Sequence, residues 1–113
     1  MSQITTHVLD TAKGLPAEGI IISLQRPTGN DQWEDITSGP TNDDGRVPNF
    51  LAADQVIAPG IYRMLFNTKA YFDQNDIQAF YPEVPVIFEI TDTEHYHIPL
   101  LLSPFGYSTY RGS

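Results

Sequence analysis

Hydrophobic and polar residues alternate along several short stretches of this chain, and a period of two is typical of β-strands with one buried face. In Ile4–Asp10, the side chains of Ile4, Thr6 and Val8 fall on one side. In Gly19–Arg26, a row of aliphatic residues does the same. Gln32–Thr37 is expected to form a third strand after a turn cluster at Pro27–Asp31. The first third of the chain therefore predicts β-structure without helices.

The same alternation returns in the second half of the chain. The segment Thr41–Gly45 is a strong turn signal, and Arg46 and Val47 are expected to leave it as a short strand. Ser103–Gly106 is a second turn signal, so the last residues should fold back as a strand beside Tyr96–Leu102. The further strands predicted by alternation are Gly60–Thr68, Glu83–Thr91 and His95–Ser103.

Only Lys69–Phe80 loses the period of two, and a short helix is expected there. Thr68 could cap its start, and the Tyr81-Pro82 pair should end it because a residue before proline resists the α-helical region. Pro99 lies inside a predicted strand, which indicates a sheet edge or a local bulge. About eight short strands with at most one helix predict an all-β protein, an antiparallel β-sandwich of two sheets.

Length and composition narrow the classes of function. The chain has 113 residues, enough for one domain spanning residues 1–113, and no cysteine that could form a disulfide or a thiolate metal site. Its formal net charge of −8 argues against nucleic acid and anionic membrane surfaces as partners. No apolar run approaches the length of a membrane span, and residues 1–4 show no signal-peptide pattern. A cytoplasmic location is expected, or a periplasmic one if an upstream signal has been removed.

Few polar residues break the strand pattern, and these are the candidates for chemistry. Among them, His95 and His97 lie two apart and so share one strand face, while His7 and Arg46 lie far away in sequence. Three histidines could form a zinc site, although a nearby guanidinium would repel the metal ion. Histidine is also the side chain best suited to proton transfer near neutral pH. The chain lacks the sequence motifs of serine hydrolases, nucleotide-binding loops and glycosidases.

Four sequence blocks, in order, cover nearly the whole chain and together are distinctive. The chain resembles the 5-hydroxyisourate hydrolases, the transthyretin-related enzymes of urate breakdown, in these blocks. In transthyretin itself, the hormone carrier of the same fold, the Tyr-Arg-Gly-Ser ending is absent and the equivalents of the site histidines are changed. The resemblance is therefore to the enzyme branch, and it rests on the blocks Thr5–Ala12, Asp44–Val47, Tyr96–Pro104 and Tyr110–Ser113.

The resemblance implies hydrolysis of the N1–C6 amide bond of 5-hydroxyisourate, giving 2-oxo-4-hydroxy-4-carboxy-5-ureidoimidazoline in purine degradation. For this reaction we expect His7 and His97 to activate water and to transfer a proton to the leaving nitrogen, with either assignment of the two roles. We expect Arg46 to neutralise charge on the substrate's oxygens. A histidine base predicts activity that falls below about pH 6.5, the ordinary imidazole value. Tyr110 and Ser113 would position substrate or water. Arg111 is a further candidate for binding the substrate.

The resemblance also implies that His95 is structural, that no cofactor or metal is needed, and that the protein is a homotetramer built as a dimer of dimers. Three alternatives stay open at this point. The first is a transthyretin-like carrier of a small ligand, whose binding channel should be more apolar. The second is a zinc hydrolase that uses His7, His95 and His97. The third, and least favoured, is a purely structural sandwich domain.

Overall fold

The computed structural model describes residues 2–112 of the chain, and buried and more exposed side chains alternate along several of its strands. These residues form one helix, α1 (Thr68–Gln74), and eight strands. The strands are β1 (Ile4–Asp10), β2 (Leu15–Pro16), β3 (Ile21–Gly29), β4 (Gln32–Pro40), β5 (Gly60–Asn67), β6 (Val84–Ile90), β7 (Tyr96–Ser103) and β8 (Gly106–Thr109).

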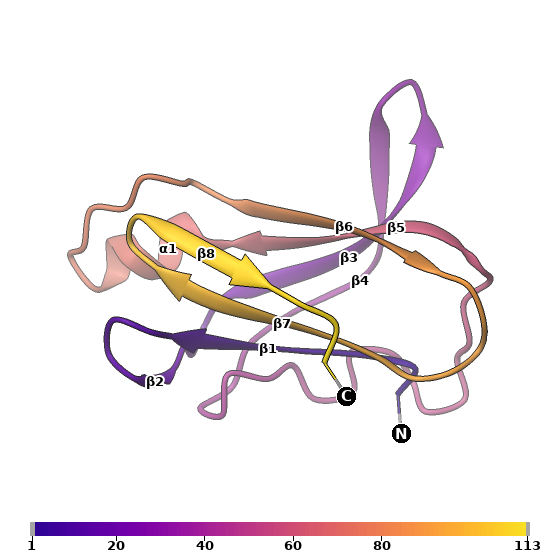
Figure 1. The fold of residues 1–113 in the computed structure, drawn as a ribbon, viewed down its shortest axis with the longest axis horizontal. Helices are drawn as coiled ribbons and strands as arrows, with labels where there is room; N and C mark the ends of the chain where they lie inside the picture. Colours follow the sequence, from indigo (N-terminus) through magenta and orange to yellow (C-terminus); the bar gives the residue numbers. More distant parts are fainter. Residues whose placement is uncertain (1, 113) are drawn as a thin grey trace.

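The strands form two four-stranded sheets with the orders β2-β1-β7-β8 and β4-β3-β5-β6. Figure 1 shows the two sheets as layers, with the β3–β4 hairpin projecting beyond them. Fully buried side chains from both sheets meet in one core between the layers. Among them are Ile4 and Val8 of β1, Leu100 of β7 and Phe66 of β5. The predicted β-sandwich with one short helix is confirmed.

Several strand boundaries differ from the sequence prediction. Strand β3 continues to Gly29, so the turn shrinks to Asn30 and Asp31, both with positive φ. Leu15 and Pro16 pair with the end of β1 as the two-residue strand β2, which alternation does not predict. Arg46 and Val47 do not form a strand, and Arg46 makes only an isolated bridge with His7. Short pairings of this kind depend on the neighbouring strand and leave no periodicity in the sequence.

The prediction of a purely antiparallel sandwich is wrong at one pair of strands. Five of the six strand pairs among residues 2–112 are antiparallel, but β1 and β7 run parallel. Parallel neighbours need a long connection, and here most of the chain lies between the two strands. This register places Thr5 opposite His97 and His7 opposite Pro99. Two distant sequence segments thereby share one sheet face.

The expectation that Pro99 marks a sheet edge is also wrong, because β7 lies between β1 and β8. Pairing with β8 begins only at Leu100, opposite Thr109. The Pro99 carbonyl accepts a hydrogen bond from the Thr109 hydroxyl, and Pro99 lies in the gap between the Leu100–Thr109 pair and the isolated His97–Gly112 bridge. A residue there needs no backbone N–H, which is the condition that proline requires.

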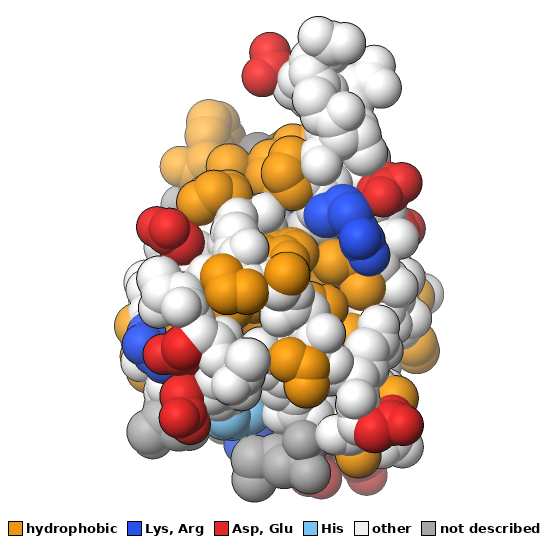
Figure 2. All heavy atoms as spheres, turned by 90° about the vertical axis from the view of Figure 1, so that its right-hand side faces the viewer, with side chains coloured by type: hydrophobic (Ala, Val, Ile, Leu, Met, Phe, Trp, Pro, Cys, Tyr) orange, Lys and Arg blue, Asp and Glu red, His pale blue; other side chains and the backbone are white. Residues whose placement is uncertain are grey.

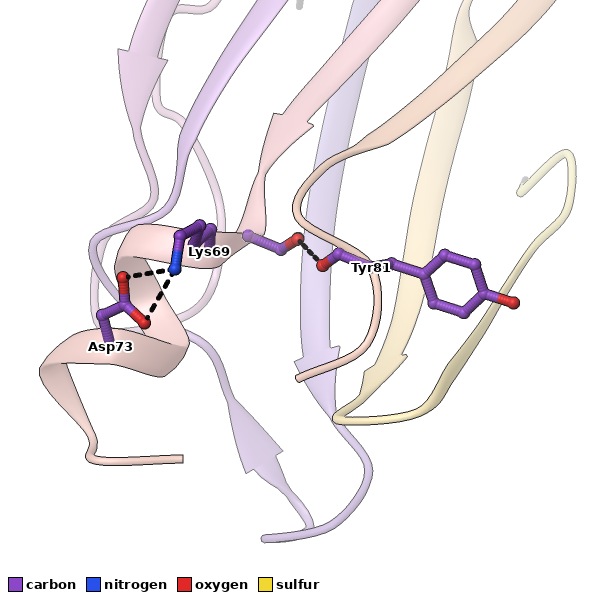
Figure 3. A network of polar contacts seen from close by, with 4 residues as sticks. Lys69, Asp73 and Tyr81 are labelled. Atoms are coloured by element: carbon purple, nitrogen blue, oxygen red, sulfur yellow. Dashed lines mark hydrogen bonds and ion pairs between the residues drawn. The ribbon is translucent and has the colours of Figure 1, made fainter. Parts of the chain in front are cut away.

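Helix α1 lies where alternation stops, as predicted, but Thr68 does not cap it. Thr68 is the first helical residue, and its hydroxyl donates to the Tyr81 carbonyl at 3.4 Å (Figure 3). The Lys69 ammonium lies 3.1 Å from a carboxylate oxygen of Asp73, one turn along the helix. The contact with Tyr81 ties the start of the helix to the segment that leads into β6.

Large apolar side chains also remain on the surface. Figure 2 shows hydrophobic side chains gathered on one face of the molecule, with acidic groups toward its margins. Among the exposed aromatic residues, Phe80 and Phe105 are mostly exposed, and Tyr107 and Tyr110 partly so. No helix among residues 2–112 has the length and apolar character needed to cross a membrane.

Candidate active site

The site begins from the alternation of strands β1 and β7. Ile4, Thr6 and Val8 of β1 point into the core, so Thr5 and His7 point outward from the sandwich. On β7, Ile98 and Leu100 are core residues, and His97 therefore lies on the same outer face as Thr5 and His7. The parallel register brings these side chains next to one another.

The two histidines are in direct contact. His7 Nδ1 and His97 Nε2 are 2.8 Å apart, a hydrogen-bond distance. Their rings stack with centroids 4.9 Å apart and an interplanar angle of 19°. The second nitrogen of His97, Nδ1, lies 2.7 Å from the Thr5 hydroxyl, which also lies 2.8 Å from His95 Nε2. His7, His97, Thr5 and His95 thus form one continuous chain of hydrogen bonds.

A tight turn places Arg46 beside this chain. The Gly45 carbonyl accepts a hydrogen bond from the Val8 backbone N–H at 2.8 Å, and Arg46 forms a bridge with His7. Gly45 has φ +74°, and a Cβ there would lie 2.5 Å from the Val8 carbonyl oxygen. Only glycine permits this approach without a shift of the backbone, and the turn therefore holds the guanidinium next to the histidines.

The C-terminal segment covers the site from the other side. The Gly112 N–H donates to the His97 carbonyl at 2.8 Å. A Cβ at Gly112 would lie 2.6 Å from His97 Cδ2, so glycine is required for this segment to pack on the imidazole ring. His97 is consequently buried despite its position on the outer face of the sheet.

A cavity of about 470 Å³ opens over these residues, within the range of small-ligand sites. Its lining residues include both contacting histidines and Arg46, residue types that offer hydrogen-bond donors, acceptors and a fixed positive charge. A larger hollow of about 550 Å³ lies beside α1, but no histidine lines it. The residues around the smaller cavity are Thr5, His7, Arg46, His95, His97, Tyr110 and Gly112.

Burial and charge keep both histidines neutral at physiological pH. Burial, with the positive charge of Arg46, lowers the pKa of His7 below its ordinary value. Burial lowers the pKa of His97 to about 4, helped by His7, Arg46 and His95. A neutral imidazole is the form that can accept a proton from water. The activity limit expected from an unperturbed imidazole therefore moves below pH 6.5.

The structure brings together most, but not all, of the candidate site residues. His7, Arg46, His97 and Tyr110 line the same cavity. Arg111 does not: its guanidinium stacks 4.3 Å from the ring centroid of Tyr96 and lines a neighbouring cavity. The candidate Ser113 lies outside the described residues.

Two residues of the cavity were not among the sequence candidates. Thr5 and Gly112 belong to the sequence blocks that carry the family resemblance, but strand patterning gives no reason to single them out. His95, expected to be structural, also lines the cavity. No group of three or more His, Cys, Asp or Glu side chains among residues 2–112 is arranged to hold a metal ion, which leaves the zinc alternative without geometric support.

The fold and the cavity define a small β-sandwich with a histidine and arginine site on the outer face of one sheet. Residues 4–112 match the HIUase/Transthyretin family, and the chain belongs to this family. It is 48% identical over 114 residues to a Mus musculus protein named 5-hydroxyisourate hydrolase, and the match covers 99% of this chain and 96% of the mouse protein.

Two solved structures show that the fold alone does not distinguish a hydrolase from a thyroxine-binding protein. The structure of Klebsiella pneumoniae 5-hydroxyisourate hydrolase is 37% identical with a TM-score of 0.85, covering 99% of this chain and 100% of that one. Sea bream transthyretin in complex with thyroxine is 31% identical with a TM-score of 0.89, covering 98% and 95%. Because both share the fold, function has to be argued from the site.

The lowered histidine pKa values predict how stability depends on pH. In the unfolded chain, a histidine takes up its proton near pH 6.5, whereas folded His97 does so only near pH 4. Between these values the unfolded state binds more protons, so the free energy of unfolding should fall as the pH drops from 6.5 to 4. His7 contributes in the same direction. Urea unfolding at pH 7, 6 and 5 measures this dependence.

The variant His97→Asn separates the contribution of His97 to the pH dependence of unfolding from the contribution of the many carboxylates. It should show a shallower loss of stability between pH 7 and pH 5 than the unmodified protein, because one of the two contributing groups is gone. Identical slopes in the two proteins would mean that His97 titrates normally in the folded state.

Proposed function

We propose that this protein hydrolyses 5-hydroxyisourate by opening its N1–C6 amide bond, giving 2-oxo-4-hydroxy-4-carboxy-5-ureidoimidazoline in urate degradation. The observation that carries the proposal is the neutral His7–His97 pair beside Arg46 in one cavity. Relatives that carry the name 5-hydroxyisourate hydrolase match nearly the full length of the chain. The substrate is a flat, polar cyclic ureide, and such a ring suits a cavity rich in hydrogen-bonding groups.

In the proposed reaction, a histidine of the pair removes a proton from water. The water oxygen then bonds to C6, the C6 oxygen takes up negative charge, and the N1–C6 bond breaks as N1 receives a proton. General acid–base catalysis of this kind contributes a factor of about 10²–10⁴. Because His7 and His97 share a hydrogen bond, the same pair can take the proton from water and return one to N1.

Arg46 stabilises the negative charge that develops on the C6 oxygen. Its guanidinium is permanently charged, and Arg46, an exposed residue of the turn, lines the cavity. It thus replaces the backbone N–H groups that hold an oxyanion in many hydrolases. Tyr110 lies at the same cavity and can orient the ring of the substrate.

The test is to generate 5-hydroxyisourate freshly and to follow the decay of its absorbance with and without the protein. Decay well above the spontaneous rate, with the expected ureidoimidazoline as product, supports the proposal. Unchanged decay at micromolar protein contradicts it. The pH dependence of the catalysed decay should show its acid limb below pH 6.5, because burial lowers the pKa of both histidines.

The second candidate function is a carrier of an aromatic ligand, favoured by the close match to sea bream transthyretin in complex with thyroxine. The cavity of this chain speaks against it, because two neutral histidines and an arginine converge there. A carrier site needs mainly apolar contacts with few polar groups. Tight binding of thyroxine together with unchanged 5-hydroxyisourate decay would reverse the choice.

We also propose a homotetramer, a dimer of dimers, in which two copies contribute to each site region. Four strands, β2, β4, β6 and β8, lie at sheet edges, and exposed edges favour pairing with another copy. Exposed aromatic side chains near β8, such as Phe105 and Tyr107, supply apolar contact area. Sedimentation at several concentrations tests this, and a fully active monomer would contradict it. The cytoplasmic location expected from the sequence stays a prediction.

A further inference from the structure

A single hydroxyl group joins two of the three histidines, and this restricts where their protons can be. Thr5 Oγ1 lies 2.7 Å from His97 Nδ1 and 2.8 Å from His95 Nε2. A hydroxyl has only one hydrogen to donate, so it cannot donate to both rings. If the hydroxyl hydrogen forms one of these two hydrogen bonds, Thr5 donates to one histidine and accepts from the other. The protonation of His95 is thereby coupled to that of His97.

The coupling extends to His7 through the contact between its Nδ1 and His97 Nε2. A neutral imidazole carries one N–H and one acceptor nitrogen. If Thr5 donates to His95, then His97 donates from Nδ1 and His7 donates from Nδ1, so all three rings carry Nδ1–H. If Thr5 donates to His97, all three carry Nε2–H. The chain of hydrogen bonds has only these two complete directions.

The chemistry of the cavity selects one direction for the resting enzyme. Among residues 2–112, no hydrogen bond occupies Nε2 of His7, which leaves this nitrogen to face a ligand or water. To take a proton from water, Nε2 has to be unprotonated, and His7 then carries its hydrogen on Nδ1. This is the direction in which Thr5 donates to His95.

We propose that Thr5 and His95 are positioning residues that hold His7 as a base and complete a proton relay, an inference that rests on the proposed hydrolase function. When His7 Nε2 binds the proton of water, the Nδ1 hydrogen of His7 passes to His97 Nε2. The Nδ1 hydrogen of His97 passes to Thr5, the Thr5 hydrogen passes to His95 Nε2, and His95 Nδ1 releases one proton. One proton enters and one leaves, and the three rings end with Nε2–H. When His7 Nε2 gives its hydrogen to N1, the shift runs back and His95 Nδ1 takes up one proton.

The surroundings of the chain favour such a neutral shift over the build-up of an imidazolium. Arg46 lies on the loop that forms a bridge with His7 of β1. The charges of Arg46, His7 and His95 all disfavour a positive charge on buried His97. From the β8 side, Tyr110 lines both the site cavity and the neighbouring cavity, which His97 also lines. Arg111 and Glu89 line only the neighbouring cavity. His95 lies at the opposite end of the hydrogen-bond chain from His7. It is only half-buried and can exchange a proton with solvent.

Nitrogen NMR of the histidine rings tests the coupling without any substrate. At pH 7.5 the ¹⁵N shifts of the unmodified protein should show His7, His95 and His97 all as Nδ1–H tautomers. Thr5→Val removes the hydroxyl at nearly unchanged volume, and His95 should then lose its tautomer preference. Opposite tautomers on His95 and His97 in the unmodified protein would overturn the proposal. This result stands whether or not 5-hydroxyisourate is the substrate.

Kinetics test the relay itself. Thr5→Val should reduce kcat about tenfold or more while KM changes little, as expected when the partner that orients a functional histidine is lost. Thr5→Ser restores the hydroxyl and should recover most of kcat. The matched control is Thr6→Val, on the same strand, whose hydroxyl donates to the Ile98 carbonyl on the core side. It should cost stability and leave kcat and the pH profile unchanged.

A Thr5→Val variant with the kcat and pH profile of the unmodified protein would overturn the relay. If the unmodified protein fails to hydrolyse 5-hydroxyisourate at all, the proposed function fails, while the NMR measurement still decides on the coupled tautomers. His95→Gln keeps a polar side chain but cannot pass a proton from one ring nitrogen to the other. It should lose about as much kcat as Thr5→Val, and the double variant should lose little more.

Discussion

Replacing Arg46 by alanine is expected to reduce kcat/KM for 5-hydroxyisourate by about 10²–10³, the cost of losing one donor to a developing oxyanion. Arg46 lines the cavity, and its antiparallel bridge with His7 places the two side chains on the same face. Its loss removes both the contact with the charged transition state and part of the binding of the polar ring. Both kcat and KM should therefore worsen, which initial rates over a range of substrate concentrations can show.

The same substitution should leave a signature in the pH profile. Arg46 lowers the pKa of His7 and of His97 by its positive charge, so without it both values should rise toward the ordinary imidazole value. The acid limb of the Arg46→Ala variant should accordingly move to higher pH. A guanidinium too far from the two histidines to act on their charge would not produce this shift.

Arg26→Ala is the matched control for Arg46→Ala. Arg26 is an exposed arginine on β3 that pairs with Glu34 at 3.4 Å, on the other sheet of the sandwich. Exposed pairs of this kind contribute little to stability, so the variant should fold normally and keep its activity. Near-normal hydrolysis by Arg46→Ala would remove Arg46 from the proposed mechanism.

Most of the fold could be predicted from the sequence because burial imposes a period of two on each long strand. Strand β1 has the predicted bounds, Ile4–Asp10, with Ile4, Thr6 and Val8 buried as expected. Strands β5, β6 and β7 begin and end within one residue of the prediction. Features that depend on a partner strand were missed, such as the two-residue β2 and the extension of β3 to Gly29.

The site was only partly predictable, for a related reason. Residue types and the family resemblance singled out His7, Arg46 and His97, but the sequence does not contain the parallel register that makes their side chains meet. That register also makes Thr5 the partner of His97, and a threonine on a strand attracts no attention by itself. The position of Arg111 over Tyr96 depends on how the segment after β8 turns, which no local pattern specifies.

The largest effect on catalysis is expected from the contacting pair of histidines. His7→Asn and His97→Asn should each lower kcat by about 10²–10⁴, the usual contribution of a positioned acid or base. Asparagine is close in size and keeps hydrogen-bonding groups, but it cannot take up a proton near neutral pH. Steady-state rates of 5-hydroxyisourate decay, corrected for the spontaneous reaction, measure the loss.

The double variant His7→Asn/His97→Asn decides whether the two rings act together. Groups that function as a unit show strongly non-additive losses, so the double variant should be no more than about tenfold slower than the slower single variant. The 2.8 Å contact between Nδ1 of His7 and Nε2 of His97 is the physical basis for this coupling. Independent roles, such as one ring binding substrate and the other activating water, would instead multiply the two losses.

Protein stability has to be measured alongside, because His97 is buried and stacked on His7. Unfolding in urea at pH 7.5 shows whether each variant is folded under assay conditions. A folded His97→Asn protein that keeps its activity would contradict the proposed proton transfer. If instead both single variants are folded and equally slow, the two rings act as one unit. His7 Nε2 then takes the proton of water while the Nδ1 hydrogen of His7 passes to His97.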